Sequence, residues 1–181
     1  MPASRNPKVQ PEEQHHHHRL TSPRSIRVLT LNPSPLFTAP LEASLTEISL
    51  DSISRPTPRY EALSYVWGSP TGDRPLRCDG KLLLVTRNCE SALRHLRGTK
   101  KARILWVDAI CIDQADGEES VQERNAQVAL MGEVYYKAAR TLCWFGEGTE
   151  FTDEVIEWLG RIGSRPSKRG LRKLLQFDGK C

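Results

Sequence analysis

The chain has 181 residues, 38% hydrophobic and 27% charged, with a formal net charge of +4, which suits one domain of ordinary size with polar tails. Its five cysteines are widely spaced without a CxxC pair, so we expect reduced thiols and a cytoplasmic location rather than a disulfide framework. The sequence shows no apolar leader and no apolar run of membrane-spanning length, which argues against secretion and against a membrane partner.

Both ends of the chain have the composition of solvated tails. Residues 1–24 are rich in Pro, Gln, Glu and His without periodicity, and we expect them to be disordered. They contain the tract His15 to His18, but isolated tracts in flexible tails are seldom structured sites, so we assign no metal site. Residues 163–181 form a basic tail, for which a solvated end is favoured over contact with nucleic acid.

The first half of the chain carries strand patterns separated by turn signals. We expect strands over residues 26–31, 45–51 and 60–66, where apolar and β-branched residues alternate or cluster. The first of these strands should have two unequal faces. Asp79-Gly80 is a natural two-residue hairpin turn and should join Leu76–Cys78 to Lys81–Val85.

Helices and buried strands alternate in the second half. Asn88 is the expected N-cap of a helix whose apolar residues repeat at helical spacing, and Gly98 can close it. Downstream we expect a strand buried on both faces over 104–107, a long helix over 121–139, a buried strand over 141–145 and a helix over 151–162.

This order of elements predicts an α/β fold with an open mixed sheet, parallel in its second half, because each parallel crossover needs a helix. The ordered domain should span residues 25–162. Asp108 follows the buried 104–107 run directly, so we place it at the carboxyl rim of the sheet, where ligands lie in open α/β folds. It can bind a ligand there, or it can cap the loop that follows.

The long helix places an arginine on its apolar stripe. Arg124 falls in the middle of the face that is formed by Val121, Val128, Met131 and Tyr135. A guanidinium directed at the core needs a carboxylate, carbonyls or a bound anion. Our hypothesis is that Arg124 pairs with Asp108 or Glu61 at the strand rim, with structural pairing favoured over substrate binding.

Other constellations are weaker. Cys111 and His95 are a thiol and an imidazole, but no spacing brings them together as a nucleophile and its base. The acidic residues around Gly117 fail the register of a calcium loop. No GxGxxG follows a strand and no phosphate-loop motif is present, so we assign no cofactor.

Five ordered blocks of the chain resemble the fungal heterokaryon incompatibility (HET) domain family. The blocks are residues 60–68, 78–97, 105–114, 123–135 and 144–146. The matching family residues include Ser64, Tyr65, Trp67, Gly68, Trp106, Asp108, Ala109, Cys111, Gln114, Gln127, Met131 and Gly146. Asp113 departs from the pattern, because the central block usually ends Ile-Asn-Gln. Members usually continue beyond the domain, so we expect this chain to be a shortened form.

The resemblance implies a role in fungal non-self recognition, in which such domains trigger programmed cell death. It also implies a distant similarity to TIR domains, which have a flavodoxin-like fold and in some cases cleave NAD with a glutamate. If that chemistry holds here, Glu123 or Glu61 is the candidate catalytic carboxylate, Arg124 lies nearby, and NAD is a substrate.

Three functions stay open on the sequence alone. The favoured one is a death effector that works by assembly with protein partners, including copies of itself. The alternative is an NAD-cleaving enzyme, and the outsider is nucleic-acid binding through the basic tail.

Overall fold

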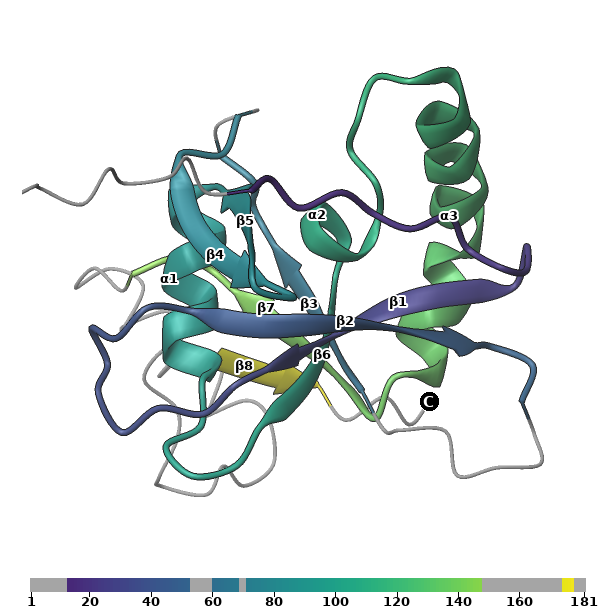
Figure 1. The fold of residues 1–181 in the computed structure, drawn as a ribbon. Coiled ribbons are helices and arrows are strands. Elements are labelled where there is room, and N and C mark those ends of the chain that lie inside the picture. Colours follow the sequence, from purple (N-terminus) through teal and green to yellow (C-terminus); the bar gives the residue numbers. More distant parts are fainter. Residues whose placement is uncertain (1–12, 53–59, 69–70, 148–173, 178–181) are drawn as a thin grey trace, which may run out of the picture.

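The structure is a computed structural model that describes residues 13–52, 60–68, 71–147 and 174–177. The described strands form one sheet in the order β5-β4-β2-β1-β6-β3-β7-β8 (Figure 1). The helix expected over 151–162 lies outside the described residues. The described elements, in chain order, are β1 (Ser25–Leu31), β2 (Glu42–Ser49), β3 (Glu61–Tyr65), β4 (Arg74–Cys78), β5 (Lys81–Val85), α1 (Arg87–Leu96), β6 (Arg103–Val107), α2 (Asp108–Cys111), α3 (Glu118–Lys137), β7 (Arg140–Trp144) and β8 (Leu174–Phe177).

Three neighbouring strands, β6, β3 and β7, run parallel with β3 in the middle. Around them β1 pairs antiparallel with both β2 and β6, β4 with β5, and β7 with β8, while β2 and β4 pair in parallel. The α/β class and the mixed sheet are therefore confirmed. The parallel group is not confined to the second half of the chain, because β3 inserts between β6 and β7.

Helices α1 and α3 cover opposite faces of the parallel strands. Tyr65 of β3 is paired with Trp144 of β7, whose ring lies 4.9 Å from that of His95 in α1. Trp106 of β6 is paired with Ala62 of β3, which stands three positions before Tyr65. The Trp106 ring lies 5.4 Å from the ring of Tyr135 in α3. Since strand residues an odd number apart point to opposite faces, the two helices lie on opposite sides of the sheet.

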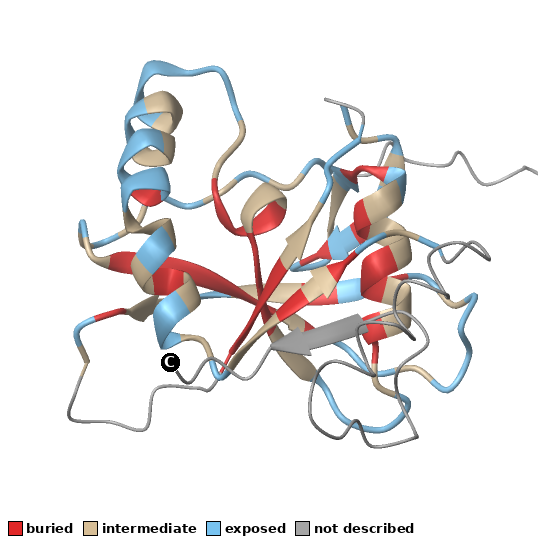
Figure 2. Cartoon of the chain, turned by 180° about the vertical axis from the view of Figure 1, so that it is seen from behind, coloured by how far each residue is buried: buried red, intermediate tan, exposed pale blue. Residues whose placement is uncertain are grey.

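The hydrophobic core follows the strands and the inner faces of the helices, which are red in Figure 2. β1 is buried along nearly its whole length on both faces, so the unequal faces expected for it are wrong. Helix α3 contributes Gln127 and Val134 to the buried interior, while the N-terminal half of the helix extends past the sheet (Figure 1). Among the described helices, none has the length and apolar character to cross a membrane.

Helix α1 begins earlier than expected. The side chain of Thr86 accepts a hydrogen bond from the N–H of Cys89 at 3.3 Å, so Thr86 is the N-cap in place of Asn88. The C-cap is Arg97 with an extended backbone, and Gly98 does not close the helix in a left-handed conformation. The Asn88 amide makes its hydrogen bonds to the ends of the parallel strands instead.

Three other elements differ from expectation. β2 begins at Glu42 because its first two residues pair with the end of β4. A short helix, α2, follows β6 directly at Asp108, where no element was expected. β8 lies in the segment assigned to the basic tail and pairs with β7. The expected hairpin is confirmed, with φ of 51° and 78° at Asp79 and Gly80.

Residues 13–24, which we call the N-terminal strap, run along the surface from the β4–β5 hairpin past α2 to α3 (Figure 1). The strap makes backbone hydrogen bonds with Leu82, and the His17 ring bonds the Ile110 carbonyl at 2.7 Å. The expectation of disorder is therefore wrong for this part of residues 1–24. Its polar composition hid the contacts because they are made by backbone groups and histidine rings.

Candidate functional site

The order of the parallel strands reverses at β3, because the chain passes from β3 to β6 on one side and then from β6 to β7 on the other. After β3 the chain leads to α1 on one face, and after β6 it leads to α3 on the other. Such a divergence creates the crevice where ligands bind in open α/β sheets. Here Trp67, just after β3, donates from Nε1 to Oδ2 of Asp108, just after β6, at 2.9 Å. Asp108 therefore lies at the carboxyl rim, and its hydrogen bond joins the ends of β3 and β6.

Both carboxylate oxygens of Asp108 have partners within the chain. Oδ1 accepts from the N–H of Ala109 at 2.8 Å, while Oδ2 accepts from Trp67. Burial raises the pKa of Asp108, and these two hydrogen bonds oppose the rise. Gln114 donates to the backbone carbonyls of Asp108 and Ile112 at 3.4 and 3.1 Å. Asp108 and Gln114 thus hold the turn after β6 in shape.

Asn88 joins α1 to the ends of β3 and β7. Its amide nitrogen donates to the carbonyl of Val66 at 2.5 Å, and its amide oxygen accepts from Nε1 of Trp144 at 2.9 Å. Gly68 and Gly146 follow the same two strands with φ of 76° and 97°. No atom lies within 4 Å of a Cβ built at either glycine, so the backbone conformation, not space, is what calls for glycine there.

A polar cleft of about 410 Å³ opens beside this rim. Its walls come from the end of β3, the first turn of α1 and the segment after β7, and a hydrogen bond of 2.9 Å joins Ser91 to Glu147 across it. The N-terminus of α1 faces the cleft with its positive dipole end. The lining can hold a small polar ligand and includes Trp67, Gly68, Asp73, Asn88, Ser91 and Glu147.

Glu61 lies at the opposite, amino edge of the parallel strands. It pairs with Arg103 at the start of β6 and with Arg140 at the start of β7, and its side chain is 12% exposed. Burial raises the pKa of Glu61, but hydrogen bonds and charge from the two guanidinium groups outweigh it, so the pKa lies below the usual 4.5. Placing Glu61 at the same rim as Asp108 was wrong, because β3 starts at Glu61.

Glu123 of α3 and Arg27 of β1 form a mostly buried ion pair that is held by two hydrogen bonds. Arg27 Nη1 and Nη2 bond the two carboxylate oxygens at 2.6 and 2.9 Å, and the side chains are 5% and 15% exposed. Arg27 also donates to the carbonyls of Cys111 and His18. Glu123 lines a second cleft, of about 660 Å³, between α3 and the N-terminal strap.

Arg124 does not pair with Asp108 or Glu61, so our hypothesis for it is wrong. Its guanidinium donates to the backbone carbonyl of Gln114 at 3.3 Å and is only partly buried. Of the stripe on which the hypothesis rested, Met131 and Tyr135 pack against the core, whereas Val128 is 54% exposed. The residues that pack on the core lie farther along α3, where the helix meets the sheet, namely Gln127, Leu130, Met131, Val134 and Tyr135.

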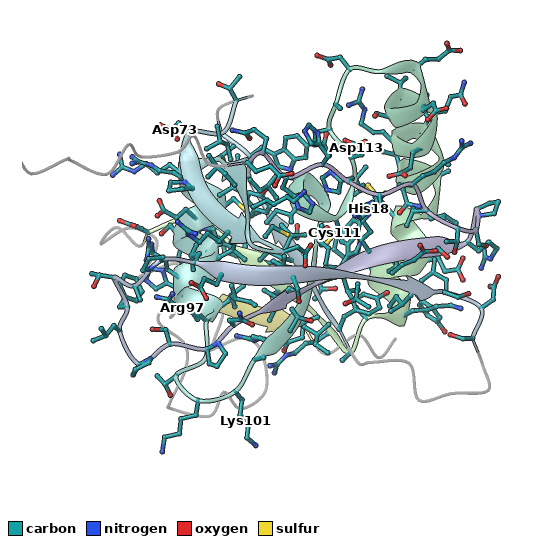
Figure 3. The ribbon with its side chains drawn as sticks, viewed as in Figure 1. His18, Asp73, Arg97, Lys101, Cys111 and Asp113 are labelled. Atoms are coloured by element: carbon teal, nitrogen blue, oxygen red, sulfur yellow. The ribbon has the colours of Figure 1, made fainter. Side chains whose placement is uncertain are left out.

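Asp113 fits its position as a hydrogen-bond acceptor. Its carboxylate accepts from the N–H of Ala115 at 3.0 Å and from the hydroxyl of Ser120 at 2.8 Å. Burial raises its pKa, but these hydrogen bonds and the nearby charge of His17 lower it overall. Asp113, His18 and Cys111 gather where the strap passes between α2 and α3 (Figure 3). An amide donor is not needed at position 113.

The remaining family residues contact the strands from the interior of the molecule. Gln127 donates to the carbonyl of Ser25 at 2.9 Å. Tyr135 donates to the carbonyl of Leu63 at 3.3 Å, and the Ser64 hydroxyl lies beside the Tyr135 hydroxyl. Met131 packs against the core, and the Tyr65 hydroxyl and the Trp106 indole N–H are buried without a partner among the described residues.

The buried thiols are not poised as nucleophiles. Burial raises the pKa of Cys78, Cys89 and Cys111 to about 12, so none of the three forms a thiolate readily near neutral pH on its own. His95 bonds the Ser91 carbonyl and contacts the Trp144 ring, on the α1 face.

Sequence reasoning missed the partners of the acidic residues. Arg27 stands inside an otherwise apolar strand, which is the same signal that drew attention to Arg124. Arg103 and Arg140 each begin a strand, and only the parallel register brings them to Glu61. A charged residue inside an apolar strand, as at Arg27, can be recognised in the sequence, whereas the parallel register that brings Arg103 and Arg140 to Glu61 cannot.

Comparison with known proteins finds a family match over the stretch of chain that contains the five blocks. The family model described as "Heterokaryon incompatibility protein (HET)" matches residues 60–173. The chain is 32% identical over 151 residues to "Heterokaryon incompatibility protein 6, OR allele" of Neurospora crassa, covering 76% of this chain and 21% of that protein. The chain thus spans about a fifth of the length of this curated relative. No solved structure matches the chain.

Proposed function

This chain belongs to the heterokaryon incompatibility (HET) family, and from that premise we propose that it is an effector domain of fungal non-self recognition. In this proposal it acts in the cytoplasm and triggers programmed cell death by assembling with protein partners, including further copies of itself. The observation that carries the proposal is the family match, which covers the parallel strands, the switch point and α3.

The state of the candidate carboxylates supports assembly over catalysis. Glu61 pairs with two arginines, Glu123 is bonded through both oxygens to Arg27, and Asp108 accepts from Trp67 and Ala109. A carboxylate held by a guanidinium is a poor base or nucleophile, because its charge is already stabilised. Each of these groups stabilises the fold in the arrangement described.

Exposed apolar residues at the rim support a protein partner. Val66 and Trp67 follow β3 and are 72% and 37% exposed, while Phe145 follows the neighbouring β7 and is 58% exposed. The register places Val66 and Phe145 side by side, one position beyond the pair Tyr65 and Trp144. Aromatic and aliphatic side chains grouped on a surface are typical of interaction sites.

The second candidate function is cleavage of NAD by a flavodoxin- or TIR-like domain. It is favoured by one observation: Glu123 lines the larger cleft and stands beside a cationic group, Arg27, that can bind phosphate. In that case NAD is a substrate, no resident cofactor is needed, and Arg27 must release Glu123 when the substrate binds. Nucleic-acid binding through residues 163–181 remains the outsider, with most of that tail outside the described residues.

Cellular NAD and viability, followed together after induction of the chain in a fungal host, separate the first two functions. We expect death with NAD unchanged, and we expect Val66→Asp to prevent death. Glu123→Gln tests the candidate carboxylate, and Glu119→Gln, which changes an exposed glutamate of the same helix, is its control. A fall in NAD before death, spared by Glu123→Gln but not by Glu119→Gln, overturns the assembly proposal in favour of the enzyme.

A further inference from the structure

The N-terminal strap is fixed to the β4–β5 hairpin at its first residues. His15 N–H donates to the carbonyl of Leu82 at 2.8 Å, and Leu82 N–H donates to the carbonyl of Glu13 at 2.8 Å. The Glu13 carboxylate pairs with Lys81 at 2.6 Å. These contacts place the first histidine of the tract against the hairpin turn.

His15 meets a thiol and a carboxylate at this turn. The potential ligand atoms of His15, Cys78 and Asp79 all lie within 4.8 Å of one another. His15 Nδ1 lies 4.0 Å from Asp79 Oδ2, and the side chains of His15 and Asp79 are 6% and 43% exposed. Cys78 is fully buried. The three residues therefore form a cluster that is mostly buried and reaches solvent through Asp79.

An unpartnered nitrogen points to a ligand here. His15 Nε2 is buried and has no hydrogen-bond partner among the described residues. A buried polar atom without a partner carries a desolvation cost that an added ligand removes. A cavity of about 170 Å³ adjoins the ring and is lined also by His17, His18, Arg27, Leu45 and Glu47. A water molecule or an added ligand has room to complete a coordination shell.

We propose that His15, Cys78 and Asp79 form a binding site for a divalent transition-metal ion of the zinc class. Nitrogen, sulfur and oxygen donors together are typical of Zn²⁺, whereas Ca²⁺ and Mg²⁺ prefer oxygen alone. At zinc distances of about 2.0 to 2.3 Å, tetrahedral ligand atoms stand about 3.3 to 3.8 Å apart. The ligand atoms, which are at most 4.8 Å apart, must therefore close by up to about one ångström, and the adjoining cavity leaves room for a fourth ligand.

Charge and protons balance at this site. The Cys78 thiol releases its proton to solvent when it binds the ion, and the resulting thiolate and the Asp79 carboxylate offset the 2+ charge. The rest of the tract does not duplicate the site: His16 and His18 are exposed, and His17 is held by the Ile110 carbonyl and by Asp113. The bound ion fastens the strap to the hairpin, and the strap in turn bonds Arg27 through the His18 carbonyl.

Titration of the purified full chain with Co²⁺ tests this proposal. Before titration the chain is stripped of metal and kept reduced with a non-thiol reductant. A cobalt–thiolate bond gives a charge-transfer absorption in the near ultraviolet that histidine-only binding lacks, and Zn²⁺ then displaces the Co²⁺. We expect this band at one ion per chain, and its loss in Cys78→Ser.

Two further variants keep the test sharp if Cys78→Ser fails to fold. Asp79 has a φ of 51°, which asparagine tolerates well, so Asp79→Asn removes the charge without disturbing the turn. We expect Asp79→Asn and His15→Ala each to weaken Co²⁺ binding by at least about tenfold, the loss seen even for outer-shell partners. His16→Ala and Cys143→Ser are the matched controls, and both should keep the band and the affinity.

Three results would overturn the proposal. Binding without a thiolate band would mean that the histidine tract alone takes up metal. A band that survives Cys78→Ser, or that disappears in Cys143→Ser, would place the thiolate elsewhere. Equal affinities in His15→Ala and His16→Ala would show that position 15 has no special role. None of these outcomes bears on the role proposed for the rim.

Discussion

Trp67 and Asp108 are joined by a hydrogen bond of 2.9 Å that spans the diverging ends of β3 and β6. The two residues are 41 positions apart in the chain; Asp108 directly follows β6, and Trp67 lies two positions after the end of β3. In folds of this kind ligands bind outside the carboxyl ends of the strands. In this chain an indole and a carboxylate bond each other at that edge, so any ligand of the rim must bind beside this pair or displace it.

Loss of the Trp67–Asp108 hydrogen bond should cost stability modestly. Trp67→Phe keeps a ring but removes the donor, and we expect a loss of about 1 kcal/mol in the free energy of unfolding. Asp108→Asn should cost about 1 to 3 kcal/mol in the free energy of unfolding. The two carboxylate oxygens accept from Trp67 and Ala109, and asparagine replaces one of these acceptors with an NH₂ group, which would point at an N–H donor. Urea denaturation measures both. In the double variant the losses should be less than additive, and strict additivity would contradict a direct bond.

Loss of one partner of the Arg27–Glu123 pair should be far more costly. Arg27→Met leaves a mostly buried carboxylate without its partner, and we expect a loss of about 3 to 5 kcal/mol in the free energy of unfolding. Replacing both residues, as Arg27→Met with Glu123→Leu, should recover much of that loss. Thermal and urea unfolding of the three chains provide the comparison.

The control for this pair lies on the same helix. Arg19 and Glu119 stand 3.7 Å apart with side chains 80% and 81% exposed. Because such surface pairs contribute little, Glu119→Gln should leave the midpoint of unfolding unchanged. If Glu119→Gln and Arg27→Met proved equally harmful, burial would not be the source of the effect.

The pH dependence of stability should report on Glu61. Its pKa in the folded chain lies below the ordinary 4.5, so the unfolded chain binds more protons at acidic pH. Its stabilising contribution is therefore present above pH 4.5 and is lost as the pH falls through the folded-state pKa. Glu61→Gln should lower stability at neutral pH and flatten the decline below pH 4.5, as measured by urea midpoints across that range.

Asp108 provides a control of opposite sign. Its pKa is raised above the ordinary 3.8, so the folded chain holds the proton more tightly and stability falls as the pH rises through that window. Asp108→Asn should therefore make the rise of stability with pH steeper just above pH 3.8. If Glu61→Gln and Asp108→Asn changed the slope of stability against pH in the same direction, the environments assigned to the two carboxylates would be wrong.

Local sequence patterns predicted most of the elements but not their partners. The hairpin at Asp79-Gly80 and the buried run before Asp108 depend on residues close in sequence, so turn chemistry and hydrophobic runs were sufficient to predict them. The pairing of Glu61 depends on the parallel register of three strands, which no local pattern encodes. Glu123 was a candidate only by resemblance, and the sequence offered no distance from it to Arg27.

The error over Arg124 has a geometric cause. A helical stripe predicts burial only where the helix lies against something, and the N-terminal half of α3 extends beyond the sheet. Val128 and Arg124 belong to that half or its margin, whereas Val134 and Tyr135 lie over the strands. Periodicity gives the direction of a side chain around the helix axis but not how far the neighbouring layer reaches along it.

The N-cap of α1 provides the last prediction. Thr86 caps the helix through its hydroxyl, so Thr86→Ala should cost about 1 kcal/mol in the free energy of unfolding, while Thr86→Ser should cost little. Asn88→Ala should cost more than Thr86→Ala, because it removes one donor and one acceptor that tie α1 to Val66 and Trp144. Urea denaturation ranks the three variants. If Asn88→Ala were the milder change, the amide would not join the helix to the strand ends, and the rim would owe its shape to the glycines and to Asp108.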